Sequence, residues 1–350
     1  MMKLLQLQKY LKKENIDLVA LFHPDNNLDY LLQEQFSYAF LFISSNDAQL
    51  YISKLDKNVN LPNIKINIVS KGWEKKFAKQ KIKKIGINKL SLSVARLEKL
   101  KKIFPKAKFV DINDQLLKFR REKTDSEINK LRKACKITTF AFNELIKEFQ
   151  KRKNTLKTEQ QVANFLESKI KQKGANLSFP TIVASGKNSA IPHHQTSTQK
   201  LNHGFLLLDF GAKYEGYHAD MSRTLFLGTP NKKELNDYNL LLKVQQQAIK
   251  QIKVGKKTAE LDKLVRQQLG KKSSYFIHSL GHGVGMEIHE SPNLGSESKD
   301  KLLKKQVFTI EPGIYFPNEY GIRIEDTILL DKKVEIFTKC PKNLILIRKV

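Results

Sequence analysis

Cysteine is scarce in this sequence of 350 residues, which contains only Cys135 and Cys340. The two lie far apart and lack a partner spacing such as C-x-x-C, so a disulfide framework is not indicated. Long apolar runs are missing as well, because no stretch reaches the 18 residues of a membrane-spanning helix. The first residues show helically spaced leucines and no small-residue cleavage site, which argues against a secretory leader. These absences favour a globular, cytoplasmic protein.

Acidic residues are heavily outnumbered, since 63 Lys and Arg oppose 35 Asp and Glu and leave a net charge of +28. Such a charge is compatible with binding to nucleic acid or to an anionic surface. However, the basic residues are mostly Lys and occur in every segment, and Arg-rich patches interleaved with aromatics are absent. Lysine distributed in this way is typical of a solvated surface. We therefore expect no specific nucleic-acid partner and no membrane partner.

The apolar pattern divides the chain into two parts. Hydrophobic residues make up 40% of the sequence, and its length suits two domains. Residues 1–117 alternate short apolar runs with helical segments, including one around 73–80, which predicts a small α/β domain. This part contains no recognisable catalytic motif.

The second part, residues 118–350, opens with two helices and continues with strands. The helices begin with capping-box spacings, Thr124 with Glu127 and Thr158 with Gln161. From about residue 178 apolar runs alternate with glycine turns, and two more helices follow near 230–253 and 258–269. This order predicts an α+β domain in which helices cover a mostly antiparallel sheet.

Two aspartates stand in strand-like runs on either side of a turn. Asp209 lies in LLLDFG, Asp220 lies in YHADMS, and the turn-forming pair Glu215-Gly216 lies between them. In a hairpin that turns there the two acids fall roughly opposite each other, and directly paired Cβ atoms lie about 4.5–5.5 Å apart. Carboxylates so close repel unless one is protonated or a cation lies between them. A surface turn explains Asp220 moderately well, but it explains Asp209 poorly because an unpaired charge inside an apolar run is costly.

Two glutamates and a histidine extend this candidate site. Glu311 follows the apolar VFTI and precedes Pro-Gly, and Glu325 lies in GIRIED, where a salt bridge to Arg323 on the same strand face would explain that pair alone. His282, in GHGVG, offers a nitrogen ligand. Four carboxylates and one imidazole suit Mn²⁺, Fe²⁺, Co²⁺ or Zn²⁺ rather than thiophilic metals. Four acids exceed the needs of one divalent ion, so two ions about 3.5–4 Å apart are expected.

Four segments carry a family resemblance: LLLDFGAKYEGYHADMSRT, HSLGHGVGMEIHE, FTIEPGIY and GIRIEDT. They resemble the ordered motifs of the creatinase, prolidase and methionine aminopeptidase superfamily, the pita-bread metallopeptidases, and the Asp-to-Asp spacing of 220 − 209 = 11 matches that family's. The motifs span residues 178–330, and the α/β region before them resembles the N-terminal domain of the proline-specific branch. The resemblance implies a pita-bread catalytic domain with a curved, mostly antiparallel sheet.

The resemblance also implies metal-binding roles. Asp209 would chelate one ion, Asp220 and Glu325 would bridge two ions, and His282 and Glu311 would complete the shell of the other. Mn²⁺ is the expected metal, with Co²⁺, Zn²⁺ or Fe²⁺ as alternatives. A hydroxide that bridges the two ions would attack the scissile carbonyl, and Glu311 would carry the proton to the leaving nitrogen.

Three further residues take catalytic roles by the same resemblance. His289 would hydrogen-bond the substrate and stabilise the oxyanion of the tetrahedral intermediate. His278, four residues before the metal-binding histidine, would border the proline pocket. Arg323, two residues before the bridging glutamate, would orient that glutamate by a salt bridge.

The last histidine of the site comes from the segment NSAIPHH, in which either His193 or His194 would serve. His193 is favoured because it directly follows Pro192, as in the corresponding family motif. The other histidines, His203 and His218, are expected to be structural, although His218 lies only two residues before a metal-binding aspartate.

These observations predict a metal-dependent Xaa-Pro aminopeptidase. A prolyl nitrogen carries no hydrogen and its ring fixes φ, so ordinary peptidases accommodate X–Pro bonds badly and a dedicated pocket is needed. The substrates would be short peptides with proline at the second position. The motifs do not separate this activity from the alternative, an Xaa-Pro dipeptidase (prolidase), and a more remote alternative is a catalytically silent peptide-binding module. The resemblance further suggests a homodimer.

Overall fold

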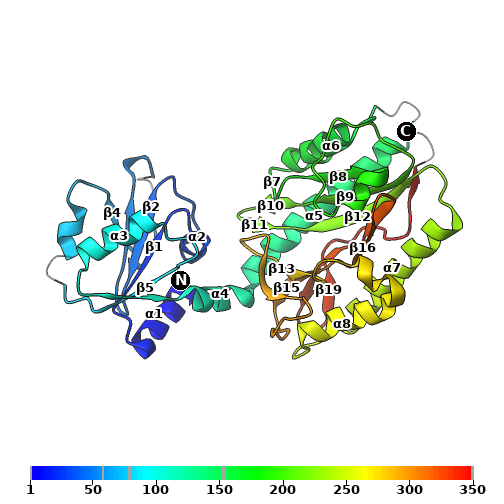
Figure 1. Cartoon of the computed structure of the whole chain (residues 1–350). Coiled ribbons are helices and arrows are strands. Elements are labelled where there is room, and N and C mark those ends of the chain that lie inside the picture. The colour runs from blue at the N-terminus through cyan, green and yellow to red at the C-terminus, as the bar shows by residue number, and fades with distance from the viewer. Residues whose placement is uncertain (1, 57–58, 78–79, 152–154, 348–350) are drawn as a thin grey trace. The chain divides into compact units, whose positions relative to one another are not determined.

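The computed structural model describes residues 2–56, 59–77, 80–151 and 155–347. The chain folds into two compact units, residues 1–119 and residues 120–350, each of which is described by itself (Figure 1). Within the described ranges, no helix is both long enough and apolar enough to span a membrane.

The first unit is built on a mixed six-stranded sheet in the order β4-β3-β2-β1-β5-β6. Its strands are β1 (Leu18–Phe22), β2 (Ala39–Ile43), β3 (Ala48–Ile52), β4 (Lys65–Ile68), β5 (Lys84–Ile87) and β6 (Lys108–Asp111). Its helices are α1 (Met2–Glu14), α2 (Asn26–Leu32) and α3 (Val94–Ile103), and α4 (Asn113–Arg121) follows. Strands β1, β2 and β3 pair antiparallel, whereas β5 and β6 are parallel and need the crossover that α3 supplies. This is the α/β arrangement that the sequence predicts.

Aromatic side chains fill the core of the first unit. The rings of Phe40 and Tyr51 stack with centroids 4.9 Å apart, and Trp73 and Phe77 pack against the same cluster. Of the helix predicted around 73–80, the described residues 73–77 form a short 3₁₀ helix, η2 (Trp73–Phe77), and residues 78–79 lie outside the described ranges. It starts after Gly72 at a φ of 80°, and one turn is enough to deliver both rings to the core.

The second unit begins with two helices on a four-stranded sheet of order β20-β12-β9-β8. The helices are α5 (Asp125–Phe149) and α6 (Glu159–Gln172), and the strands are β8 (Ile182–Ser185), β9 (Gly204–Phe210), β12 (Met221–Leu227) and β20 (Leu346–Ile347). Both helices start with the predicted capping boxes, at Thr124 and at Thr158. Their apolar faces form one continuous core with β8, β9 and β12.

A second layer of the same unit packs two more helices on another sheet (Figure 1). The helices are α7 (Lys232–Lys250) and α8 (Thr258–Leu269). The sheet has the order β14-β13-β15-β18-β19, with β13 (His282–Gly283), β14 (Glu290–Asn293), β15 (Gln306–Ile310), β18 (Asp326–Leu330) and β19 (Val334–Ile336). Strands β16 (Gly313–Phe316) and β17 (Tyr320–Arg323) form a separate hairpin between β15 and β18. The apolar runs in residues 306–330 are thus interrupted at Glu311-Pro312 and at Ile324-Glu325, where the chain leaves one sheet and rejoins it.

Short strands and turns complete the second unit. Strands β7 (Asn176–Leu177), β10 (Ala212–Tyr214) and β11 (Tyr217–His218) form a three-stranded sheet. Besides η2, the 3₁₀ turns are η1 (Lys54–Asp56) in the first unit, and η3 (Gly186–Ala190) and η4 (Gly270–Tyr275) in the second. The predicted turn at Glu215-Gly216 joins β10 to β11 with φ values of 47° and 83°, the left-handed conformation that tight hairpins require. Among the described strands of this unit only β12 and β20 pair in parallel, so the expected mostly antiparallel α+β domain is confirmed.

Candidate metal centre

Two antiparallel strand pairs bring four carboxylates to one place, one pair from each layer. In the first layer Asp209 lies on β9 and Asp220 immediately precedes β12. Asp209 pairs with Ser222, so the two aspartates, predicted to lie roughly opposite each other, are offset by two residues. Because side chains alternate faces with a period of two, Asp220 still shares the face of Ser222 and lies diagonally across from Asp209.

The second layer repeats this arrangement with glutamates. Ile310 at the end of β15 pairs with Asp326 at the start of β18, so Glu311 and Glu325 occupy the next positions beyond the ladder. At these two positions the chain leaves β15 for the β16–β17 hairpin and returns from the hairpin to β18. The ends of two strand pairs thus supply acids where backbone pairing stops and side chains are free to converge.

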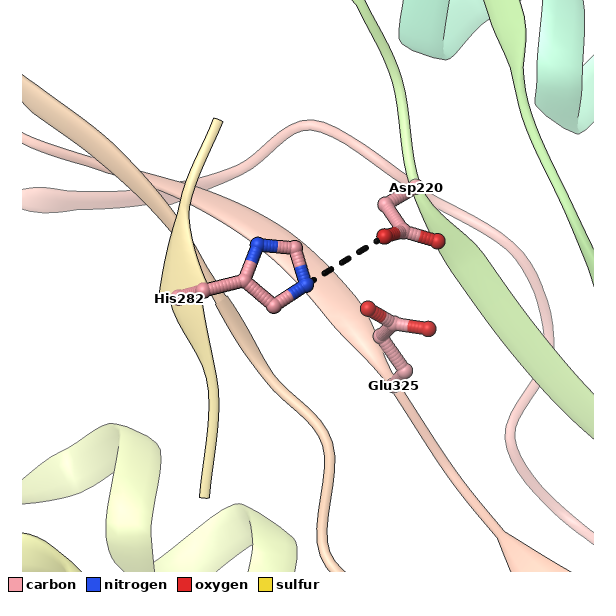
Figure 2. Close-up of side chains that lie close together, drawn as sticks. All are labelled: Asp220, His282 and Glu325. Carbon is pink, nitrogen blue, oxygen red and sulfur yellow. Dashed lines mark ion pairs between the residues drawn. The ribbon is translucent and has the colours of Figure 1, made fainter. Parts of the chain in front are cut away.

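Three ligand atoms converge closely, because Asp220, His282 and Glu325 each offer one atom within 4.8 Å of the others (Figure 2). His282 Nε2 lies 3.5 Å from Asp220 Oδ2 and 3.3 Å from Glu311 Oε1. The other ring nitrogen, Nδ1, lies 3.1 Å from the carbonyl oxygen of Gly283, which can only accept, so Nδ1 carries a proton. Nε2 therefore faces the acids, as it does in histidines that ligate metals.

Within the described part of the chain, the clustered acids lack partners for some of their carboxylate oxygens. Asp209 Oδ1, Asp220 Oδ1 and Glu325 Oε1 are buried and accept no hydrogen bond from any described donor. Burial raises the pKa of Asp220, and the carboxylates of Asp209 and Glu311 raise it further. Burial also raises the pKa of Glu325, with the charge of Asp220 as the next cause. Buried carboxylates with free lone pairs and mutual repulsion fit divalent cations, so the residues present match the predicted metal site.

Arg323 is connected to the acids differently from the prediction. Its Nη2 lies 2.7 Å from Asp209 Oδ2, so the ion pair is formed with that aspartate. Its Nε donates to Ser222 Oγ at 2.8 Å, and this hydroxyl donates to Glu325 Oε2 at 2.7 Å. The predicted direct salt bridge to Glu325 is therefore replaced by a relay through one serine.

Tyr315 joins this guanidinium to a histidine. Arg323 Nη1 donates to Tyr315 Oη at 2.6 Å, and the same hydroxyl lies 3.0 Å from His278 Nε2. Since His278 Nδ1 lies 2.8 Å from the carbonyl of Ser279, Nδ1 donates and Nε2 accepts from the tyrosine. Burial lowers the pKa of His278, so its imidazole is neutral at pH 7.

His289 lines the cavity beside the candidate ligand His282. Its ring centroid is 4.3 Å from that of His282, with the two planes at 78°. Burial lowers the pKa of His289, and the neighbouring imidazole of His282 is the next cause. A neutral imidazole here can donate one hydrogen bond and accept another.

The histidines of the PHH segment separate clearly. Both histidines line the cavity, but His194 Nε2 lies 2.9 Å from the buried carboxylate of Glu159, which fixes it to α6, whereas the side chain of His193 is exposed. His218 bonds Ser178 Oγ at 2.9 Å, and burial lowers its pKa to about 4. His203 packs its ring edge-on to an aromatic core residue. Neither His203 nor His218 is among the cavity-lining residues.

A cavity of about 1020 Å³ surrounds this cluster. Its lining includes every residue predicted for the site: His193, Asp209, Asp220, His278, His282, His289, Glu311, Arg323 and Glu325. Apolar residues, among them Phe179, Pro192 and Ile288, line other parts of its wall. A cavity with partly apolar walls, convergent acids and several imidazoles can hold metal ions and a small peptide.

Comparison with known proteins agrees with this geometry. Residues 129–332 match the model of metallopeptidase family M24, and residues 3–121 match the creatinase/prolidase N-terminal domain. The chain belongs to the M24 metallopeptidase family. The resemblance inferred from the four motifs, the two-part fold and the assignment as a metal-dependent peptidase are therefore confirmed.

Relatives of this M24 peptidase match it over its whole length. A protein named Xaa-Pro dipeptidase from Pyrococcus furiosus is 33% identical over 353 residues, which cover 98% of this chain and 99% of the relative. The solved structure of the prolidase from Pyrococcus horikoshii has a TM-score of 0.91 at 33% identity, covering 99% and 100% of the two chains. That of an X-Pro aminopeptidase from Thermotoga maritima has a TM-score of 0.86 at 30% identity, covering 95% and 98%.

Three residues of the M24 site were not found from the sequence: Ser222, Thr309 and Tyr315. Thr309 Oγ1 accepts from the backbone of His282 and donates to Glu311 Oε1, each at 3.0 Å, and so joins two predicted ligands. For Tyr315 the sequence offers one weak indication, the glycine at position 321. Gly321 is the strand partner of Tyr315, and a Cβ added there would lie 2.6 Å from the tyrosine ring. Small polar residues on strands give no comparable signal.

Proposed function

We propose that this M24 peptidase is an Xaa-Pro dipeptidase that hydrolyses the bond between an N-terminal residue and proline. The aminopeptidase activity expected from the sequence gives way to this alternative, because full-length relatives at about one-third identity carry the dipeptidase name. The observation that carries the proposal is the cluster of four carboxylates and His282 that lines the cavity, in which Asp209, Asp220 and Glu325 each keep an unsatisfied acceptor atom among the described residues.

Five residues would hold two divalent ions: Asp209, Asp220, His282, Glu311 and Glu325. Mn²⁺ is the proposed metal, since oxygen-rich sites with one imidazole suit it, and Co²⁺, Zn²⁺ and Fe²⁺ are alternatives. When bound, such ions supply Lewis acidity and lower the pKa of water to near neutrality.

The chain's own residues would bind the peptide and move its protons. Thr309 donates to Glu311 Oε1, which leaves Oε2 to accept a proton from water and deliver it to the leaving prolyl nitrogen. The water oxygen adds to the carbonyl carbon, and the C–N bond breaks afterwards as the nitrogen takes the proton, so that the amine leaves as free proline. His289 would donate to the carbonyl oxygen as it gains negative charge.

The proline ring would bind beside two imidazoles. His278 is fixed by Tyr315 and Ser279, and His193 faces the same cavity. Imidazole rings present flat surfaces that suit a proline ring lacking an amide hydrogen. Arg323 would fix Asp209 and, through Ser222, Glu325, so that both keep their orientation while substrate exchanges.

The test compares Ala-Pro, Ala-Pro-Ala and Ala-Ala as substrates of the Mn²⁺-loaded protein, with free amino acids measured by chromatography. The proposal expects rapid release of alanine from Ala-Pro and at least tenfold slower release from the other two. Equal release of alanine from Ala-Pro-Ala would support the X-Pro aminopeptidase instead, an alternative that the likeness to the Thermotoga structure favours. Failure to cleave any of the three with each candidate metal would overturn both.

We further propose a cytoplasmic homodimer without specific nucleic-acid or membrane partners. The even spread of lysine along the chain supports the absence of a nucleic-acid partner. Sedimentation at micromolar concentration tests the dimer, and a monomer would contradict it. Salt-resistant binding to duplex DNA or RNA would contradict the proposed absence of such partners, because nonspecific electrostatic binding falls steeply with salt.

A further inference from the structure

The turn that carries His289 is held by its backbone rather than by its own ring. Residues 284–289 connect β13 to β14 without regular secondary structure. Within the described part of the chain, the His289 imidazole contacts the ring of His282 and forms no hydrogen bond. The position of this imidazole therefore depends on how the neighbouring backbone is fixed.

The next residue, Glu290, is a buried hub. Its side chain is 2% exposed and its Oε2 accepts from Lys123 Nζ at 2.8 Å. Its Oε1 accepts from the guanidinium of Arg120 and from the backbone N–H of Glu287, the latter at 3.0 Å. One carboxylate thus connects the segment before α5, the middle of the turn and the start of β14.

The charges around this hub balance. Arg120 Nη2 also donates to the carboxylate of Glu287 at 2.9 Å, so two cations face two anions. Burial raises the pKa of Glu290, but Lys123 and Arg120 outweigh burial and bring it to about 2. The carboxylate is therefore ionised at neutral pH, and a buried charge with this many partners is rigidly placed.

The turn is shaped to receive the carboxylate. A Cβ added to Gly285 would lie 2.5 Å from Glu290 Oε2, so a side chain there would displace the carboxylate. The carbonyl of Gly285 accepts from the backbone N–H of His218 at 2.8 Å, which fixes the other side of the turn. The third glycine of GHGVG therefore makes room for Glu290, which gives this residue of the motif a role apart from metal binding.

The far end of β14 is held by the same segment of chain. Arg121 Nη2 lies 2.8 Å from Asp300 Oδ1, and Asp300 Oδ2 accepts from the backbone of Asn293 at 2.9 Å. Lys123 is itself anchored, because its backbone N–H donates to the carbonyl of Lys305 at 2.8 Å. Both ends of the strand that follows His289 are thus fastened by residues 120–123.

We propose that Glu290 is a positioning residue, whose buried ion pairs with Arg120 and Lys123 hold the His289 imidazole over the metal centre where the substrate carbonyl binds. The catalytic part of this inference, the reaction that His289 serves, rests on the proposed function. The structural part, the geometry of the turn, does not depend on that function. A displacement of a catalytic group by about 1 Å can cost as much as 100-fold in rate, so anchoring of this kind is required for turnover.

The test compares Glu290→Gln with the double variant Glu290→Gln/Lys123→Met. The single change leaves two buried cations facing one anion and is expected to unfold readily. The double variant restores the balance with one cation and one anion, and so keeps the fold while removing the anchor. A third variant, Glu290→Asp, retains the charge on a shorter side chain and should recover part of the lost activity.

The matched control is Asp237→Asn, which removes another buried carboxylate far from the turn in sequence. Asp237 pairs with Lys272, accepts from Tyr320 Oη at 2.7 Å, and is not among the residues that line the cavity. This variant should lower the melting temperature and leave kcat of the folded protein unchanged.

Three measurements are made on each protein: kcat and KM for Ala-Pro, bound metal per chain, and the ¹³Cε1 resonance of His289 in the Zn²⁺-loaded state. In the double variant kcat should fall about 10- to 100-fold with unchanged metal content. The His289 resonance should move while that of His203 stays in place. Wild-type kcat and an unmoved His289 resonance in the double variant would overturn the inference.

The resonance also separates this inference from the proposed function. If the wild-type protein cleaves no Xaa-Pro peptide, the proposed function fails, and the His289 resonance alone then decides whether Glu290 positions the ring. If the wild-type protein is active and the double variant loses kcat only in proportion to its metal, Glu290 acts on metal binding and the positioning role is wrong.

Discussion

Arg323 and Asp209 form an ion pair in the candidate metal centre, with Nη2 and Oδ2 2.7 Å apart. The guanidinium is 4% exposed and uses its remaining donors on Ser222 and Tyr315. A lysine has one charged nitrogen on a flexible stem and cannot reach three acceptors that lie in different directions. The planar fork of arginine is therefore the feature that joins the two layers of the site.

Arg323→Lys should lower kcat/KM for Ala-Pro by about 10- to 100-fold, the usual effect of losing a group that orients metal ligands. Steady-state kinetics across a Mn²⁺ titration would show the loss persisting at saturating metal. Arg132→Lys is the matched control, because Arg132 pairs with Glu335 near the surface, and its kinetics should not change. Recovery of full activity by excess Mn²⁺ would mean that Arg323 only raises metal affinity.

His282 and His289 lie with their rings 4.3 Å apart but have different predicted roles. His282→Ala removes a proposed metal ligand and should reduce bound Mn²⁺ per chain. His289→Ala removes a group that is proposed to bind the substrate rather than the metal ions, so metal content should stay at the wild-type level while turnover is lost. Metal analysis after gel filtration measures both, with His203→Ala as the control that changes neither. If both site variants retained metal equally, this division of roles would be wrong.

Three of the proposed metal ligands could be predicted from the sequence because each is an acidic residue in a setting that otherwise demands apolar ones. Asp209 interrupts a buried strand, and Glu311 and Glu325 stand where apolar runs break before turns. Such departures from the apolar pattern cost free energy unless a ligand compensates, so they are visible without a structure. The family resemblance then added the roles of the histidines.

The connections between these ligands could not be predicted, because they depend on register. A shift of two residues decides that Asp209 pairs with Ser222 instead of Asp220, and with it that a serine relays Arg323 to Glu325. The hub at Glu290 was hidden for a similar reason, since its partners Arg120 and Lys123 lie about 170 residues away in sequence. One extra acid beside His289 gives no sign of such long-range pairing.

Removal of the metal should make the stability of the protein depend on pH in a defined direction. Burial and the neighbouring carboxylates raise the pKa of Asp220, and burial and Asp220 raise that of Glu325. A carboxyl whose pKa is higher in the folded state holds its proton there and releases it on unfolding, so the folded state loses stability as pH rises above the ordinary carboxyl pKa of about 4. The melting temperature of the chelator-treated protein should therefore fall from pH 5 to pH 8.

Divalent ions should reverse this fall, because ions bound between the carboxylates replace the protons. Mn²⁺ at 100 times its dissociation constant stabilises the folded state by about 2.7 kcal/mol at one site. Asp220→Asn removes one of the repelling charges, so the metal-free variant should show a flatter pH profile and a smaller gain from Mn²⁺. Differential scanning fluorimetry with and without chelator measures both effects, and Asp237→Asn serves as the control with an unaltered centre. A wild-type melting temperature that rose with pH in the absence of metal would contradict the repulsion between these carboxylates, and with it the argument that a cation belongs between them.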